Sequence, residues 1–281
     1  MADGPLHPVL ASLAQPRFEV VPIKGLEQQL AYLPERATVT VTSSPARGID
    51  ATLALAELLA RDGRFRVVPH IAARLVRDRT QLSRLLGHLA DLHLDEVFVV
   101  AGDAPAPAGD FEGAVDLLRA MAEIGHDLRV GVTGYPESHA FIPDGTTVQA
   151  MTEKQAFASY IVSQICFDPR VIAGWIAAVR ARGTHLPIYI GLPGAVDLAK
   201  LVRVSLRVGI GDSLKFLRKQ SGAVARMVGG YRPDHLVDGL AGTVADPDLN
   251  VAGWHLFTFN DIRSTEAWRQ QLLARYARNT A

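Results

Sequence analysis

The chain has 281 residues with 48% hydrophobic and 21% charged side chains, a composition typical of a compact soluble protein with a sizeable core. Lysine plus arginine and aspartate plus glutamate both total 29, so the formal net charge is zero, and no basic run supports nucleic-acid binding. The single cysteine, Cys166, excludes an internal disulfide framework, and with no membrane-spanning apolar run or secretory pattern we expect a cytoplasmic protein.

Short runs rich in valine, isoleucine, phenylalanine and tyrosine recur along the chain and predict strands covered on both faces. Eight such strands are expected, at Phe18–Pro22, Thr38–Thr42, Arg66–His70, Glu96–Ala101, Arg129–Thr133, Tyr160–Ile165, Pro187–Gly191 and Trp254–Phe259.

The segments between these strands have the spacing of amphipathic helices. Residues 51–62 follow Asp50 as a candidate N-cap, and residues 81–93 follow Thr80 in the same way. After the sixth strand, Asp168 is expected to cap a helix whose first position is Pro169. A last helix is predicted near Thr265–Arg278.

Eight strand–helix units form either a closed barrel or a doubly wound open sheet. A dinucleotide-binding open sheet should carry G-x-G-x-x-G after its first strand, but here the only G-x-G, Gly209–Gly211, lies far downstream and lacks the third glycine. We therefore predict an α/β fold, a (β/α)8 barrel of the TIM type, as a single domain over residues 1–281.

In such barrels the chemistry gathers where the strands end. The polar residues at these ends include Thr42, His70, Asp103 and Gln164. Glu19 lies inside the apolar first strand, where a carboxylate must point into the barrel mouth or lose its hydration without compensation.

The strand ends read, in order, FEVVP, PH, GDAP, GYPESH, SQICFD, PIYIGLP and GWHLFTFN, spanning roughly residues 17–260. Together they resemble the methylenetetrahydrofolate reductase family in its short bacterial form. The resemblance implies reduction of 5,10-methylenetetrahydrofolate to 5-methyltetrahydrofolate, with folate and NADH or NADPH as small-molecule partners. It leaves the choice of nicotinamide cofactor open, and a homo-oligomer is compatible with it.

The resemblance also implies roles for individual residues. Glu19 would supply a proton as the folate ring opens, Asp103 would lie near the pterin and the cationic iminium, and Gln164 would hydrogen-bond the folate ring. Burial would raise the pKa of Glu19 and keep its proton available. Each residue also has a structural alternative: an ion pair for Glu19, a turn for Asp103 and a core hydrogen bond for Gln164.

Further candidates follow from the same motifs. Tyr135 could stack on a bound ligand, and Thr42, His70 and His139 match family positions near the nicotinamide or flavin. No metal site is expected, because the nine histidines are scattered and form no H-x-x-x-H or H-E-x-x-H pattern.

The chain departs from the flavin-dependent members of the family at three positions. Ala101 replaces an arginine before Gly-Asp, Glu153 stands where a lysine precedes the glutamine by eleven residues, and Phe157 replaces a glycine. Because these changes remove cations and add an anion and a ring, we expect no tightly bound FAD and a direct transfer of hydride from NAD(P)H.

Two alternatives remain open on the same barrel. A folate-dependent one-carbon transferase would keep Asp103 and Gln164 but need no hydride donor. A folate-binding protein without catalysis would have no use for a buried proton donor such as Glu19.

Overall fold

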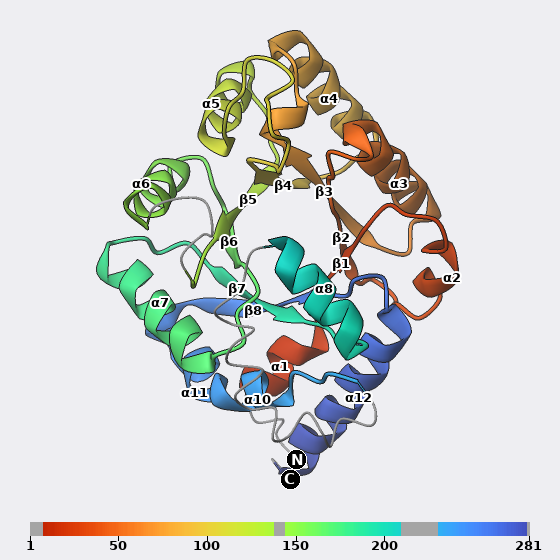
Figure 1. The fold of residues 1–281 in the computed structure, drawn as a ribbon, viewed down its shortest axis with the longest axis vertical. Coiled ribbons are helices and arrows are strands. Elements are labelled where there is room, and N and C mark those ends of the chain that lie inside the picture. The colour runs from red at the N-terminus through yellow and green to blue at the C-terminus, as the bar shows by residue number, and fades with distance from the viewer. Residues whose placement is uncertain (1–7, 138–143, 209–229, 280–281) are drawn as a thin grey trace.

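Eight parallel strands close into one barrel in the computed structural model, which describes residues 8–137, 144–208 and 230–279. Each strand pairs with the next along the chain, and β8 pairs with β1 to close the ring (Figure 1). The strands are β1 (Arg17–Val20), β2 (Thr38–Val41), β3 (Arg66–Ala72), β4 (Glu96–Val100), β5 (Arg129–Gly134), β6 (Tyr160–Ser163), β7 (Ile188–Pro193) and β8 (Val251–Phe257). The predicted (β/α)8 TIM barrel is confirmed.

All eight predicted strands are present, and their bounds differ by a few residues. The largest difference is at β8, which begins at Val251 rather than Trp254. The extra residues pair with the start of β7 across an irregularity between Ile188 and Tyr189. Gly253, which has a φ of 148°, lies in this part of β8 and weakened the sequence signal for a strand.

Most helices form the outer layer around the barrel, whereas α8 crosses in front of the strands in the view of Figure 1. The α-helices in the described residues are α1 (Pro8–Ala14), α2 (Glu27–Leu30), α3 (Gly48–Asp62), α4 (Arg79–Asp91), α5 (Ala114–Ile124), α6 (Asp144–Lys154), α7 (Pro169–Ala181), α8 (Leu198–Val208), α10 (Asp234–Gly239), α11 (Ala241–Ala245) and α12 (Ile262–Asn279). Two short 3-10 turns, at Ala73–Leu75 and Pro247–Leu249, complete the described elements.

The first residues of α3, α4 and α7 show which of the predicted N-caps are present. Asp168 caps α7 as expected, because its carboxylate accepts the backbone N–H of Arg170 and Pro169 is the first helical residue. The prediction that Thr80 caps α4 is wrong, because the carboxylate of Asp78 caps this helix by accepting the backbone N–H of Gln81. Asp50 is also not a cap, since α3 begins two residues earlier, at Gly48.

The described residues form three hydrophobic clusters: a large core between strands and helices, a small cluster around Phe167 and Tyr231, and an inner core inside the barrel. The inner core contains Val68, Phe98, Tyr160 and Val162, each nearly inaccessible to solvent. Gly131 makes room for the largest of these rings, because a Cβ atom on Gly131 would lie 2.2 Å from the Tyr160 ring. The inside of the barrel is thus filled with side chains below its mouth, as is usual for this fold.

The N-terminal helix α1 lies across the closing strand at the end of the barrel where the strands begin. Trp254 Nε1 donates to Ser12 Oγ at 2.8 Å, and Arg269 of α12 donates to the carbonyl oxygen of Leu13 at 2.8 Å. Residues from both ends of the chain therefore fasten this end of the barrel.

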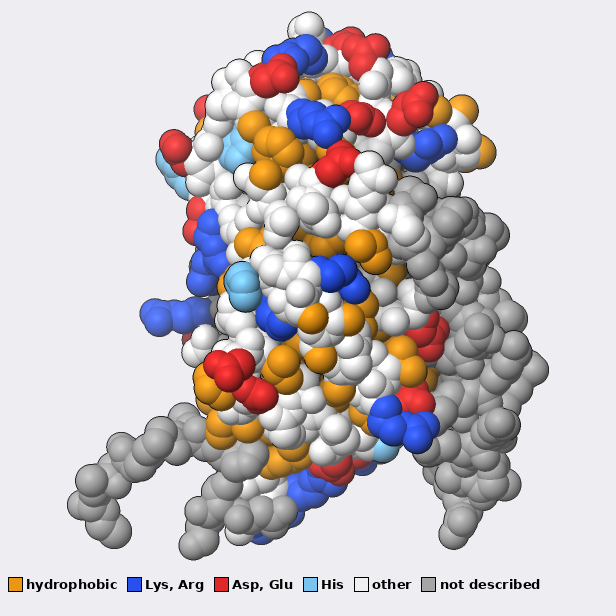
Figure 2. Space-filling view, turned by 90° about the vertical axis from the view of Figure 1, so that its left-hand side faces the viewer, with side chains coloured by type: hydrophobic (Ala, Val, Ile, Leu, Met, Phe, Trp, Pro, Cys, Tyr) orange, Lys and Arg blue, Asp and Glu red, His pale blue; other side chains and the backbone are white. Residues whose placement is uncertain are grey.

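The outer surface mixes charges of both signs. Figure 2 shows lysine, arginine, aspartate and glutamate side chains interspersed with hydrophobic ones on the flank that carries α5, α6 and α7. Among the helices that the structure describes, none combines the length and the apolar character needed to cross a bilayer.

Candidate active site

Glu19 lies near the end of β1 and points into the barrel. Its neighbours in register are Thr40 on β2 and Phe257 on β8. The backbone carbonyl of Glu19 accepts a hydrogen bond of 2.6 Å from the Thr258 hydroxyl. The Glu19 side chain is only 16% exposed. The sequence-based placement of this carboxylate at the barrel mouth is consistent with the structure.

Two histidines from other strands approach the Glu19 carboxylate. His255 of β8 places Nε2 3.2 Å from Glu19 Oε2, within hydrogen-bonding distance. His70 of β3 places Nε2 3.9 Å from the same oxygen. Both imidazoles are buried, and strand closure brings together three side chains that are far apart in the sequence.

Burial sets the protonation of this group. It raises the pKa of Glu19 to about 7, although the nearby His70 acts in the opposite direction. Burial also lowers the pKa of His70 to about 4 and that of His255 well below its usual value. Near neutral pH both histidines are therefore neutral, and Glu19 can hold or release a proton.

Several buried side-chain atoms on β2, β3 and β8, or just after β2, have no hydrogen-bond partner. These atoms are Thr40 Oγ1, Ser43 Oγ, His70 Nε2 and His255 Nδ1. Buried polar atoms are nearly always bonded in native proteins, so such a group is suited to bind the polar edge of a ligand. No cluster of three or more potential metal-ligating side chains occurs within the described ranges.

Asp103 lies just after β4, and Tyr135 directly follows β5. Gly102 turns the chain out of β4 with a φ of 90°, and a Cβ atom there would approach Ala72 to 2.9 Å. Asp103 is therefore presented to solvent at the rim. The pKa of Tyr135 is raised by burial and by the negative charge of Asp103, while a hydrogen bond to Thr133 opposes this rise.

Gln164 and Thr42 also lie at strand ends and are partly exposed. Gln164 Oε1 accepts the backbone N–H of Ile165 at 2.8 Å, which leaves the side-chain amide group to donate elsewhere. In the described part of the chain, no hydrogen bond or ion pair joins Glu19, Asp103 and Gln164 to one another. His139 lies outside the described residues.

Ala101 directly follows β4 and carries no cationic side chain. Its carbonyl oxygen accepts the backbone N–H of Arg74 at 2.9 Å. The Arg74 guanidinium donates to the carbonyl oxygens of Ala104 at 2.7 Å and Pro105 at 3.0 Å. The same guanidinium donates to the carbonyl oxygen of Glu112 at 3.1 Å, so Arg74 holds the loop that carries Asp103 through backbone oxygens.

The structure corrects the interpretation of Glu153. Its carboxylate pairs with Arg119 of α5 at 2.8 Å on the outer surface, so it adds no anion beside β5. The next residue, Lys154, is 5% exposed, and its Nζ donates to the Thr133 carbonyl at 3.0 Å. Burial lowers the pKa of Lys154 to about 8.

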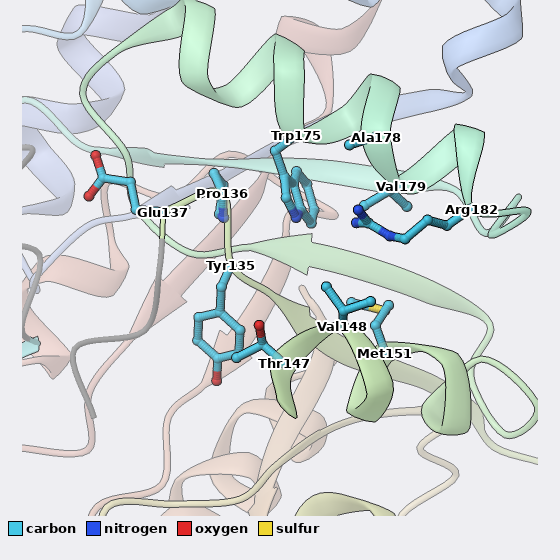
Figure 3. A pocket seen from close by; sticks show the side chains of 10 residues that line it. All are labelled: Tyr135, Pro136, Glu137, Thr147, Val148, Met151, Trp175, Ala178, Val179 and Arg182. Carbon is cyan, nitrogen blue, oxygen red and sulfur yellow. The ribbon is translucent and has the colours of Figure 1, made fainter. Parts of the chain in front are cut away.

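Phe157 and the cavity between α6 and α7 lie away from the Glu19 group. Phe157 packs against the core between strands and helices. A cavity of about 310 Å³ lies between α6 and α7, where Tyr135 and Glu137 meet Trp175, Met151 and Arg182 (Figure 3). Glu19 and the two histidines do not line this cavity, so the catalytic candidates lie elsewhere, at the barrel mouth.

Sequence reasoning missed His255 and Lys154. His255 could have been identified from the sequence, because a histidine in the apolar run of β8 is as costly to bury as the glutamate in β1. Lys154 had none, since only the rotation of α6 distinguishes it from Glu153.

A closed parallel barrel with an ionisable carboxylate and polar loops at its C-terminal mouth defines a TIM-barrel protein with an enzyme-like site. The family model for methylenetetrahydrofolate reductase matches residues 23–271. The chain belongs to the methylenetetrahydrofolate reductase family. The matched range includes Asp103, Tyr135, Gln164 and His255 and begins four residues after Glu19.

Individual relatives are distant. Methylenetetrahydrofolate reductase 2 of Saccharomyces cerevisiae is 28% identical over 119 residues, which cover 38% of this chain and a fifth (20%) of the yeast protein. An uncharacterized protein from Clostridium thermocellum, described as binding two copies of 5-methyl-5,6,7,8-tetrahydrofolic acid, has a TM-score of 0.65 at 12% identity. That match covers 95% of this chain and 98% of the clostridial chain and supports the fold.

Proposed function

We propose that the protein is an oxidoreductase that reduces 5,10-methylenetetrahydrofolate to 5-methyltetrahydrofolate with NADH or NADPH. The observation that carries this proposal is Glu19, a buried carboxyl at the barrel mouth whose pKa is raised to about 7 by burial, in a chain of this family. The folate ligand named for the clostridial protein of similar fold is a further point in its favour.

The first step assigned to the chain is proton donation. The Glu19 carboxyl gives its proton to N10 of the folate as the bond between N10 and the bridging carbon breaks. The electron pair of that bond moves to N10, and the bridging carbon becomes a cationic iminium on N5. A group whose pKa lies near the working pH is suited to this role, because enough of it is protonated and it still releases the proton readily.

The second step is hydride transfer to the iminium carbon. NADH or NADPH supplies the hydride and is oxidised, a new C–H bond forms, and the electron pair of the C=N bond returns to N5. The Asp103 carboxylate stabilises the positive charge before this transfer. The free amide N–H groups of Gln164 bind the pterin ring, and Tyr135, beside Asp103, contacts the same ligand.

Thr42 and His70 are the residues proposed to contact the nicotinamide. His70 Nε2 is buried without a partner and neutral, so it can bond to a carboxamide without a charge. The neighbouring Thr40 and Ser43 hydroxyls are also unpartnered. His139 stays a sequence-based candidate for the same cofactor.

We further propose that hydride passes directly to folate, with no flavin. Ala101 supports this proposal, because methyl cannot replace the bidentate phosphate contacts of a guanidinium. Lys154 is evidence against a flavin-free mechanism, because it places one buried cation near β5. Glu153 no longer supports the absence of a flavin, because its carboxylate forms an ion pair with Arg119 on the surface.

One assay tests both parts. Purified protein is mixed with methylenetetrahydrofolate and NADH or NADPH without added flavin, and the absorbance of the reduced nicotinamide is followed. The expected result is oxidation that depends on folate, in protein with no visible flavin absorbance. Stoichiometric flavin in the purified protein would overturn the flavin-free mechanism alone. No oxidation with or without FAD would overturn the reductase, and folate binding without turnover would then favour the non-catalytic alternative.

A further inference from the structure

A second cavity lies at the opposite end of the barrel, where the strands begin. Its volume is about 180 Å³, and it is lined by the first residues of β1, β2, β3, β4 and β5 together with the segment before β2. The charged side chains that line it are Arg17, Glu35, Arg36, Arg66, Glu96 and Arg129. Four guanidinium groups therefore surround one small space.

Arg17 is the buried member of this group. Its side chain is 5% exposed and lies over the rings of Tyr160 and Tyr189, at 4.6 and 4.9 Å from their centres. Nη2 donates to Glu96 at 2.5 Å and to the Tyr160 hydroxyl at 2.8 Å. Nε is buried and has no hydrogen-bond partner, so this cation has unused capacity to donate.

Arg36 enters the cavity from the segment before β2. It adopts a φ of 59°, a left-handed backbone conformation that is uncommon for a residue with a side chain. Its guanidinium forms no hydrogen bond or ion pair in the described part of the chain. An unpaired arginine held in this conformation at the rim of a basic cavity is well placed to bind a ligand.

The charge of the lining is unbalanced. Glu96 is 3% exposed and is already bonded by both Arg17 and Arg129, the latter at 3.1 Å. Arg66 lies 3.7 Å from Asp95, a weak and exposed contact. With four arginines against two glutamates, the lining residues carry a net charge of plus two.

We propose that this cavity is a binding site for a phosphate-type oxyanion, separate from the catalytic mouth. Guanidinium groups bind phosphate oxygens through paired N–H bonds, and a dianion would neutralise the excess charge of the lining. Arg36, Arg66 and Arg129 supply the rim and wall, and Arg17 supplies the buried donors. This inference does not rest on the proposed reductase activity.

Thermal unfolding of the full chain in increasing inorganic phosphate tests this site, with ionic strength held constant by sodium chloride. A ligand that binds only the folded protein raises the unfolding midpoint in a saturable manner that yields a dissociation constant. The same titration with glycerol phosphate distinguishes a free ion from a phosphate ester. We expect saturable stabilisation, and Arg36→Gln should weaken the apparent affinity about tenfold, the size of one charge-assisted hydrogen bond.

Two control variants make the result specific. Arg170→Gln removes an exposed arginine at the start of α7, at the mouth end of the barrel, where it pairs with Asp168 at 2.9 Å, and should leave the phosphate affinity unchanged. Glu19→Gln should also leave it unchanged, because Glu19 lies at the other end of the barrel. Phosphate stabilises folded proteins in general by exclusion from their surfaces. A rise that does not saturate and is equal in Arg36→Gln would therefore overturn the proposal. A clear change of phosphate affinity in Glu19→Gln would place the anion at the mouth instead.

Discussion

His255 Nε2 lies 3.2 Å from Glu19 Oε2, and this contact joins the last strand of the barrel to the first at the point where the chemistry is proposed. Because His255 is buried and its pKa is well below the usual value, it meets the carboxyl as a neutral ring. A neutral imidazole can orient Glu19 without fixing its charge, which leaves the carboxyl free to change protonation during turnover.

Replacing Glu19 by glutamine should suppress turnover far more than folate binding. The amide has nearly the same shape as the carboxyl but no proton to give, so we expect kcat to fall about 100-fold or more. Steady-state kinetics and folate titration by fluorescence measure the two quantities. Equal loss of both would assign Glu19 a structural role.

The same variant should change how stability depends on pH. The pKa of Glu19 is raised from 4.5 in the unfolded chain to about 7 in the folded protein, so the folded state binds the extra proton between these values. The stabilising contribution of this group is complete below pH 4.5 and is lost as the pH rises through about 7.

His70 acts in the opposite sense over nearly the same range. Its pKa is lowered from 6.5 to about 4, so its contribution to stability is present above 6.5 and is lost as the pH falls through about 4. The two groups oppose each other in the wild-type protein. Urea unfolding should therefore show Glu19→Gln gaining stability relative to wild type, by about 3 kcal/mol, as the pH rises from acid to neutral. A constant difference would contradict the raised pKa.

His255 is expected to act as a positioning residue. If its Nε2–H donates to the Glu19 carboxylate, His255→Leu removes that donor and raises the pKa of Glu19. The descending limb of the pH–rate profile should then move to higher pH, with a lower kcat. His255→Gln, whose amide can reach a similar position, should restore both in part. An unshifted limb in His255→Leu would exclude this role.

Glu96 should matter for stability and not for chemistry. It is buried between Arg17 and Arg129 at the end of the barrel remote from the mouth. Glu96→Gln leaves the buried Arg17 without its counter-charge, and breaking such a pair costs about 3–5 kcal/mol. Glu57→Gln, which breaks an exposed helical pair with Arg61, should cost less than about 1 kcal/mol. Urea unfolding measures both, and activity per folded molecule should be unchanged.

Residue patterns predicted the barrel well because the strands are buried on both faces and read as β-branched runs. They also identified Glu19 as a candidate site residue, because a carboxylate in an apolar strand is costly to bury without a role. Contacts that depend on barrel closure could not be predicted in the same way. The approach of His255 to Glu19 and of Glu96 to Arg17 follows from strand register and from side chains that cross the inside of the barrel.

Local geometry decided the remaining differences. Glu153 and Lys154 are adjacent on α6, and a helix turns adjacent residues by about 100°, so only the structure assigns one to the surface and the other to β5. Thr80 and Asp78 are both good capping residues, and the sequence does not say which one adopts the extended backbone of a cap.

The hydrogen bond from Trp254 to Ser12 joins residues separated by 242 positions in the chain. During synthesis the barrel can close at this seam only after the eighth strand has been made, so the first strand must wait with one edge unpaired. Trp254 stands at that seam, and its fluorescence should report the last stage of folding rather than the collapse that precedes it. For this fold, the beginning of the chain is among the last parts to reach its final neighbours.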